Sequence, residues 1–293
     1  MKVFRRHVYS EHKSGPVGSS ERTGAWAGVP IRALEHLEDF RVSRWSPPPT
    51  FSSATLVGTA GSGANGWTFT NIGTPTSPGL SVLDSGAIAL TSGTAAATGL
   101  NLQYSSSTDC YYGMAGAWSG GLLSVTAGNG ASIVFNFRVG ISQASGTFAS
   151  GAAVVCGYWA TDTSLLTTAG ASDISASGWG FYMNSTGVYA VSGSSGQNST
   201  LVGTVPTPGA TSTGLNSTFN NYSIRVEKAT GSANLEAIYF YVNNTLKATH
   251  TTTLPASTVS ANLSLAATTP DTTAVIAHFD DISFAATRPG YTN

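Results

Sequence analysis

The sequence predicts an all-β protein made of antiparallel strands, either a sandwich or a barrel. From residue 51 onward, short segments recur in which apolar and polar residues alternate, and this period of two is typical of strands with one buried face. Clusters rich in Gly, Ser, Thr and Asn separate these segments. They fall at spacings of roughly ten to twenty residues, which indicates antiparallel hairpins. The sequence shows neither a longer internal repeat nor heptads, so a propeller, a solenoid and a coiled-coil shaft are not expected.

The clearest strands lie between Phe219 and His250. Residues 222–226 alternate between apolar and polar, which predicts a strand with one face on the core. Residues 235–242 are apolar at nearly every position and predict a central strand covered on both faces. Asn243-Asn244 then supplies the positive-φ pair that a two-residue hairpin turn needs. The other predicted strands are Trp67–Asn71, Ala87–Thr91, Leu100–Tyr104, Leu122–Ala127, Ser132–Val139, Ala153–Ala160, Gly180–Asn184, Val188–Ser192 and Ala274–Ala285.

The composition indicates a folded chain whose surface carries few charges. Only 9% of the 293 residues are charged, against about 25% in ordinary globular proteins. The hydrophobic content of 41% argues against disorder and supplies a sizeable core without help from disulfides or metals. Cys110 and Cys156 are the only two cysteines, and we expect them to be small buried hydrophobes in a reducing compartment.

Residues 1–50 differ in charge from the rest of the chain. They hold eight basic and five acidic residues, so the leading segment is basic and the remainder is acidic although the net charge is -1. A basic arm on an acidic body suggests docking onto another surface. The proline run at residues 47–49 is a stiff spacer. We therefore expect an N-terminal anchoring arm over residues 1–50 and a β-sandwich domain over residues 51–293.

One short helix is predicted inside the arm, over about residues 30–40. Pro30 suits the first helical position, and apolar residues at helical spacing form a single stripe that must pack on the body or on a partner. Two arginines follow the stripe and complement the negative end of the helix. The residues expected to bind a partner are Arg5, Arg6, Ile31, Leu34, Leu37, Phe40, Arg41 and Arg44.

Three segments near the C-terminus carry a family resemblance. The segment 219–227 reads FNNYSIRVE, the segment 238–246 reads IYFYVNNTL, and the segment 278–284 reads HFDDISF. These resemble the strands and hairpin of concanavalin A-like (laminin-G-like) jelly rolls, with Asn244 in place of the usual Gly. The resemblance spans about residues 131–286 and implies two packed antiparallel sheets. Because this fold serves lectins, glucanases and viral coat appendages, it does not fix a function.

Together with the basic arm and the charge-poor body, the jelly roll resembles virion proteins of tailed bacteriophages. We therefore expect a non-enzymatic virion structural protein, a head decoration or a fibre or appendage, anchored through its arm. The expected partners are capsid or tail proteins and further copies of the chain, with a trimer favoured, and an appendage could also contact a host surface glycan. The first residues have no apolar run of the signal-peptide type, which favours synthesis in the host cytoplasm and residence in the virion.

Tests for catalytic motifs are negative. The glycanase pattern E-x-D-x-x-E, the G-x-S-x-G elbow and phosphate-binding loops are absent from the sequence. Glu227 and Glu236 flank an expected turn at residues 229–234 and could face each other across the hairpin, as the two carboxyls of a divergent glycanase would have to. Two separate surface charges are the simpler interpretation. His278 is expected to be a packed core histidine. The acidic body also speaks against nucleic-acid binding, and no segment is long and apolar enough for a membrane span.

Two further sets of residues have a functional and a structural interpretation. Asp271, Asp280 and Asp281 are weak candidates for a calcium site, since hard cations prefer carboxylate oxygens, but hydrogen-bonded structure is favoured and no cofactor is expected. Trp118, Trp159 and Trp179 could stack on sugars, which makes a carbohydrate-binding, receptor-recognition module the main alternative function. In a sandwich, however, tryptophans are more often part of the core.

Overall fold

The computed structural model describes residues 33–38, 67–82, 88–104, 132–144, 146–159, 177–193, 197–209, 218–228, 235–255 and 262–287. Within these ranges the chain is all β and contains no helix. The strands are β1 (Ala33–Glu38), β2 (Trp67–Ile72), β3 (Gly79–Val82), β4 (Ile88–Thr91), β5 (Thr98–Tyr104), β6 (Ser132–Gln143), β7 (Ala153–Trp159), β8 (Gly178–Asn184), β9 (Gly187–Gly193), β10 (Gln197–Gly203), β11 (Asn220–Lys228), β12 (Leu235–Val242), β13 (Thr245–His250), β14 (Asn262–Thr269) and β15 (Val275–Thr287).

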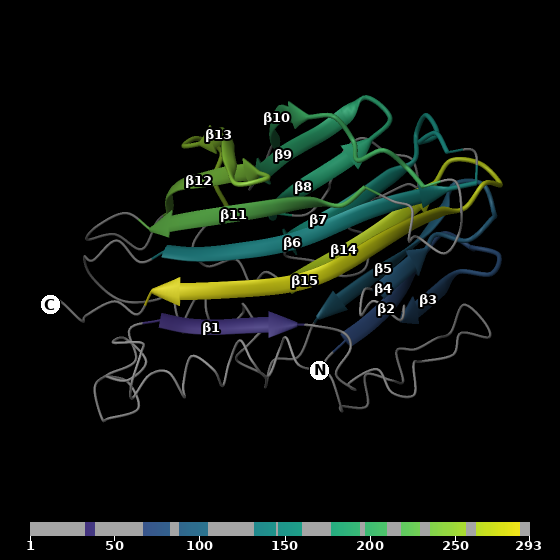
Figure 1. Cartoon of the computed structure of the whole chain (residues 1–293), viewed down its shortest axis with the longest axis horizontal. Helices are drawn as coiled ribbons and strands as arrows, with labels where there is room; N and C mark the ends of the chain where they lie inside the picture. The colour runs from purple at the N-terminus through teal and green to yellow at the C-terminus, as the bar shows by residue number, and fades with distance from the viewer. Residues whose placement is uncertain are drawn as a thin grey trace, which may run out of the picture.

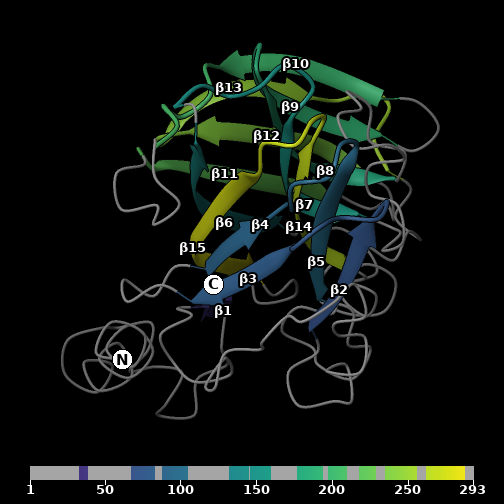
Figure 2. The ribbon, with the colours of Figure 1, turned by 90° about the vertical axis from the view of Figure 1, so that its right-hand side faces the viewer.

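The described strands form two stacked sheets (Figures 1 and 2). Sheet A has the order β13-β12-β11-β6-β15-β4-β3, with β1 also paired to β15, and sheet B has the order β10-β9-β8-β7-β14-β5-β2. All paired strands run antiparallel, and the chain passes repeatedly from one sheet to the other. This arrangement is a two-sheet antiparallel jelly-roll sandwich, so the predicted fold class is confirmed.

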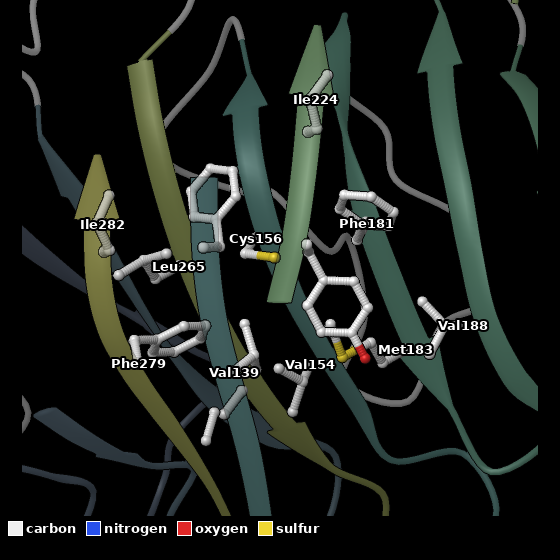
Figure 3. Packing of buried hydrophobic residues seen from close by; sticks show 14 of the residues in the cluster. Val139, Val154, Cys156, Phe181, Met183, Val188, Ile224, Leu265, Phe279 and Ile282 are labelled. Atoms are coloured by element: carbon white, nitrogen blue, oxygen red, sulfur yellow. The ribbon is translucent and has the colours of Figure 1, made fainter. Parts of the chain in front are cut away.

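The side chains between the sheets form one continuous apolar core. It is lined from sheet A by residues such as Val139, Ile224 and Phe279 and from sheet B by residues such as Cys156 and Phe181 (Figure 3). These side chains are fully buried. The strands that line this core contribute alternate residues, for example Val154, Cys156 and Tyr158 of β7, because successive side chains of a strand point to opposite faces. In the predicted strand Ser132–Val139, apolar and polar residues alternate over residues 133–139, and the burial of Phe135, Phe137 and Val139 confirms that one face lies on the core.

Aromatic rings stiffen the middle of this core. The Phe181 ring lies 5.0 Å from the Tyr222 ring and 5.5 Å from the Phe240 ring, and the second pair meets edge to face. Such offset pairs add about 0.5–1.5 kcal/mol each beyond the buried area. Cys156 is buried and free, and burial raises the pKa of its thiol. It therefore behaves as the apolar side chain that the sequence led us to expect.

Sheet B is apolar on its outer face as well. On β7, Val154 and Cys156 join the central core, whereas Ala153, Val155 and Trp159 belong to a second buried cluster. The second cluster also contains Ile72, Tyr182, Val191 and Ala266. A strand buried on both faces reads as a continuous apolar run, which is why residues 153–159 lack alternation.

The predicted helix over residues 30–40 is wrong for the part that is described, because Ala33–Glu38 is the strand β1. It pairs antiparallel with β15, from Ala33 opposite Thr287 to Glu38 opposite Ile282. A single helical turn or two is unstable alone, whereas strand pairing satisfies the backbone groups along the edge of β15. Tertiary pairing thus overrides the helical spacing of the apolar residues.

Other departures concern strands with weak patterns. β3, β10 and β14 were not predicted, and β10 begins within one of the Gly-, Ser- and Asn-rich clusters that were expected to separate strands. Residues 235–242 are not covered on both faces, since Tyr239 and Tyr241 are half-buried on the outer face of sheet A. The predicted turn at Asn243-Asn244 is confirmed by φ angles of 48° and 65°. The segment 122–127 lies outside the described residues.

The close packing of the outer cluster of sheet B can be tested by substitutions at two glycines. A Cβ added at Gly180 would lie 2.5 Å from the Cys156 carbonyl oxygen and 2.7 Å from Cζ2 of Trp159, whereas one at Gly203 would meet nothing within 4 Å. Gly180→Ala should therefore lower the free energy of unfolding by about 1–3 kcal/mol, and Gly203→Ala should change it by less than about 0.5 kcal/mol. Urea unfolding of the two variants tests this. Equal effects at the two sites would contradict the packing.

Candidate functional site

A group of polar side chains lies on the outer face of sheet A, where β6 and β15 pair. The register places Arg138 opposite Asp280 and Gly140 opposite His278. Because alternate residues share a face, Arg138 and Ser142 from β6 lie beside His278 and Asp280 from β15. The bulge between Asp280 and Ser283 then returns Ile282 to the core, where it is 2% exposed.

His278 is sealed within this group. Its side chain is 0% exposed, and its Nε2 lies 3.0 Å from the hydroxyl of Ser142. Its Nδ1 is buried without a hydrogen-bond partner. Burial lowers the pKa of His278 to about 4, because desolvation disfavours the charged form. The imidazole is therefore neutral at pH 7 and has no surface through which a substrate could reach it.

Arg138 and Asp280 form an ion pair beside His278. The guanidinium Nη1 donates to Oδ2 of Asp280 at 2.7 Å. The same guanidinium lies 4.9 Å from the centroid of the Phe219 ring, a distance typical of a cation–π contact. Phe219 in turn covers Gly140, where a Cβ would come within 3.2 Å of the ring. The pair and the ring thus close the outer face of sheet A over His278.

A second buried histidine joins the two sheets. His250 lies at the end of β13, in sheet A, and is 2% exposed. Its Nδ1 is 2.8 Å from the Ser192 hydroxyl on β9, and its Nε2 is 3.1 Å from the Thr200 hydroxyl on β10. Burial lowers the pKa of His250. Both ring nitrogens are therefore engaged, and this histidine ties the edge of sheet A to the edge of sheet B.

The charged residues considered for glycoside hydrolysis do not form a reactive pair. Glu227 makes an ion pair with Arg225, with Nε and Oε1 3.0 Å apart. The Arg225 guanidinium lies 4.3 Å from the Tyr239 ring centroid, and the hydrogen bond to Glu227 raises the pKa of Tyr239. Glu236 is exposed. Glu227 is thus held by its own neighbours on an open surface, with no opposed carboxylate to act as acid or base.

The three aspartates proposed for calcium do not converge in the part of the chain that is described. Asp280 is committed to Arg138. Asp271 is exposed, and its Oδ1 accepts a hydrogen bond from the Thr273 amide at 2.7 Å. The side chain of Asp281 lies outside the described residues. Over the described ranges, no three His, Cys, Asp or Glu side chains are grouped so that they could hold a metal ion.

The tryptophans proposed for sugar stacking lie in the interior where the structure describes them. Trp159 and Trp179 are both 0% exposed. Trp179 lies in the central core, with its ring stacked 5.9 Å from that of Tyr158, and Trp159 belongs to the outer cluster of sheet B. Neither ring presents a face to solvent. Trp118 lies outside the described residues.

Of the arm residues proposed to bind a partner, two lie in β1. Leu34 is opposite Ala286 and Leu37 is opposite Ser283. Both leucines thus belong to a strand of sheet A and not to the predicted helix. The other six proposed arm residues, Arg5, Arg6, Ile31, Phe40, Arg41 and Arg44, lie outside the described residues.

Sequence reasoning identified His278 but not its partners. Ser142 is 136 positions away from His278, and Arg138 is 142 positions away from Asp280. The hydroxyls of Ser192 and Thr200 that hold His250 were also missed. The only available signal was the alternation along residues 133–139, which, once extended to residue 143, places Arg138 and Ser142 on the outer face. Their pairing depends on the register of β6 with β15, which a single sequence does not specify.

No protein-family model and no curated protein matches the sequence. Solved structures with a similar fold include a protein of unknown function from Shewanella oneidensis MR-1, with 14% identity over 89% of this chain and 90% of that chain and a TM-score of 0.45. They also include the carbohydrate recognition domain of Emp47p, with 13% identity over 75% and 88% of the two chains and a TM-score of 0.43. A third similar structure is the β-glucanase of Bacillus licheniformis. It has 11% identity over 85% of this chain and 97% of that chain, with a TM-score of 0.42.

At these identities and TM-scores the likeness transfers neither carbohydrate binding nor glucan hydrolysis to this chain. Lectin-type domains and enzymes occur side by side among the similar structures. The structure also contains, within its described residues, no helix with the length and hydrophobicity that a bilayer crossing requires.

Burial of His278 predicts a stability that depends on pH. Its pKa lies near 4 in the folded chain and near 6.5 when unfolded. The unfolded state therefore binds more protons between these values, so stability is full above pH 6.5 and is lost as the pH falls towards 4. The loss attributable to this residue between pH 7 and pH 4 is about 3 kcal/mol.

His278→Gln, which keeps a donor for the Ser142 hydroxyl, should reduce the stability lost on acidification by about that amount. Urea unfolding of the native protein and the variant at the two pH values measures the difference. Parallel pH profiles for the two proteins would show that His278 is not buried in its neutral form.

Proposed function

We propose that this chain is a non-enzymatic structural protein of a tailed-bacteriophage virion, a head decoration or a fibre or appendage, attached through its N-terminal residues. The observation that supports the non-enzymatic part most directly is the state of its polar groups. His278 and His250 are sealed in the interior with lowered pKa values. The partly exposed Arg225 and Glu227 neutralise each other on an open strand surface.

Catalysis would require a base or a nucleophile that a substrate can reach. The hydroxyl of Ser142 and the ring of His278 are within hydrogen-bond distance, but both residues are 0% exposed. Burial raises the pKa of the Cys156 thiol, which keeps it protonated and unreactive. Ser142, His278 and Cys156 thus belong to the interior of the sandwich, as expected of side chains with a structural role.

The attachment is assigned to the residues that precede β1. Thirty-two residues lie before Ala33 in the sequence, and they carry six of the basic residues of the arm. β1 itself is paired along β15, so its backbone is already engaged by the sandwich. A basic segment on an acidic body favours docking onto a negatively charged surface of another protein.

Carbohydrate recognition is the alternative role, and an appendage could combine it with attachment to a host surface glycan. Its main sequence support was a set of tryptophans that could stack on sugar rings. Trp159 and Trp179 are fully buried and so do not supply such a platform. We therefore rank the structural role first.

Two truncations test the role of the arm. A chain lacking residues 1–32 keeps β1, whereas a chain lacking residues 1–45 loses it. Tagged full-length protein and both truncated chains would be produced during infection, and their incorporation into purified particles would be quantified by immunoblotting and immunogold electron microscopy.

The chain lacking residues 1–32 should unfold at the temperature of the full-length protein but fail to enter particles. The chain lacking residues 1–45 should in addition be less stable, because the Ile282–Thr287 edge of β15 loses its partner strand. Incorporation of the shorter chains at full occupancy would contradict attachment through the arm. Absence of the full-length protein from particles would contradict the virion role itself.

A further inference from the structure

Along one edge of β10, the outermost strand of sheet B, the described residues supply no partner strand. β10 ends the order of this sheet and pairs only with β9 among the strands that the structure describes. It lies at the rim of the sandwich in both views of the ribbon (Figures 1 and 2). Leu201 on this strand is 58% exposed, the larger value of the two exposed large hydrophobic residues of the described ranges, and Ser199 is exposed beside it. The unpaired side of such a strand offers backbone donors and acceptors to another strand.

The β10 edge lacks the charge that usually prevents such pairing. Residues 174–224 contain no Asp, Glu, Lys, Arg or His, and this neutral stretch includes the whole of β8, β9 and β10. By contrast, β13, one of the two strands that end the order of sheet A, carries the exposed residue Lys247 and has an irregular register with β12 between Phe240 and Tyr241. Natural edge strands are commonly protected by such a lysine or bulge.

The geometry of β10 is suitable for a regular ladder. Gln197 to Leu201 pair with Gly193 to Tyr189 of β9 one residue at a time, and the register shifts only between Leu201 and Gly203. The inner side of the strand is fixed, because Thr200 bonds His250 at 3.1 Å and Val202 is 6% exposed in the core. A strand already held in place loses little conformational freedom when a partner strand is added.

We propose that β10 pairs with β10 of a second copy of this chain, antiparallel and about a two-fold axis near Ser199. The two seven-stranded sheets then become one continuous sheet across the dimer. A second copy is favoured as the partner because an isologous contact places identical residues opposite one another. A charged strand would meet its own charge in that arrangement, whereas this neutral strand meets none. The exposed Leu201 of each copy is partly covered by the contact.

This inference is independent of the proposed virion role. A two-fold contact produces dimers or larger even-numbered assemblies, whereas the sequence alone favoured a trimer, and the assembly state in solution distinguishes the two. It also confines the contact to a strand whose backbone is already ordered, rather than to the N-terminal arm.

Charge placed at the two-fold axis tests the proposal in the full-length protein. Ser199→Lys brings two lysines together in the dimer and should weaken association by about tenfold or more, since a repulsion of about 1.4 kcal/mol suffices for that factor. Thr249→Lys, an exposed threonine on β13, is the matched control and should leave association unchanged. Sedimentation equilibrium over a wide range of concentrations measures the assembly state of each protein.

The complementary variant Ser199→Glu makes the test specific for a second copy. Each variant alone should be mainly monomeric, and an equimolar mixture of Ser199→Lys and Ser199→Glu should recover the dimer as a mixed species. A monomeric or trimeric native protein, equal weakening by Thr249→Lys, or no recovery in the mixture would each overturn the proposal. Circular dichroism confirms that every variant keeps its β-sheet content, so loss of association is not mistaken for unfolding.

Discussion

The hydrogen-bond ladders of β15 hold this structure together. One edge of the strand pairs with β6 from Val275 to Ala286. The other edge is divided, since β4 pairs with Ile276–Phe279 and β1 pairs with Ile282–Thr287. Backbone groups buried in a sandwich must find partners, and β15 finds them in strands drawn from the beginning and the middle of the chain. Sheet A therefore forms only when segments far apart in sequence have come together, which is the feature of topology that slows folding.

The bulge in β15 allows one strand to serve both the core and the polar group on the outer face. Before it, Phe279 points into the core while His278 and Asp280 point outward; after it, Ile282 is again buried. Without the extra residue the alternation would place Ile282 on the same face as His278 and Asp280. The ion pair of Asp280 with Arg138, the Phe219 ring and the sealed histidine all depend on this local irregularity. The outer face of sheet A around these residues is therefore rigid and unreactive.

The sequence predicted those elements whose own residues carry the signal. Alternation located β6 and β11, and the asparagine pair located the β12–β13 turn. β14 was missed because its small residues, NLSLAATT, show no strong period, and β10 was missed because Gly and Ser precede it. The apolar residues around segment 33–38 have the spacing of a helix. The segment nevertheless forms a strand, because it pairs with the backbone of β15. The partners of both buried histidines depend on register and on the packing of the sheets, which are properties of the whole fold.

Attachment through the residues before β1 requires that β1 itself be a strand of the sandwich. Hydrogen–deuterium exchange followed by mass spectrometry measures this directly in the full-length protein. About half of the amides of residues 33–38, those that face β15, should exchange far more slowly than the amides of an unprotected chain, because they donate to this ladder. Exchange of residues 33–38 at the rate of an unprotected chain, with residues 282–287 still protected, would contradict it.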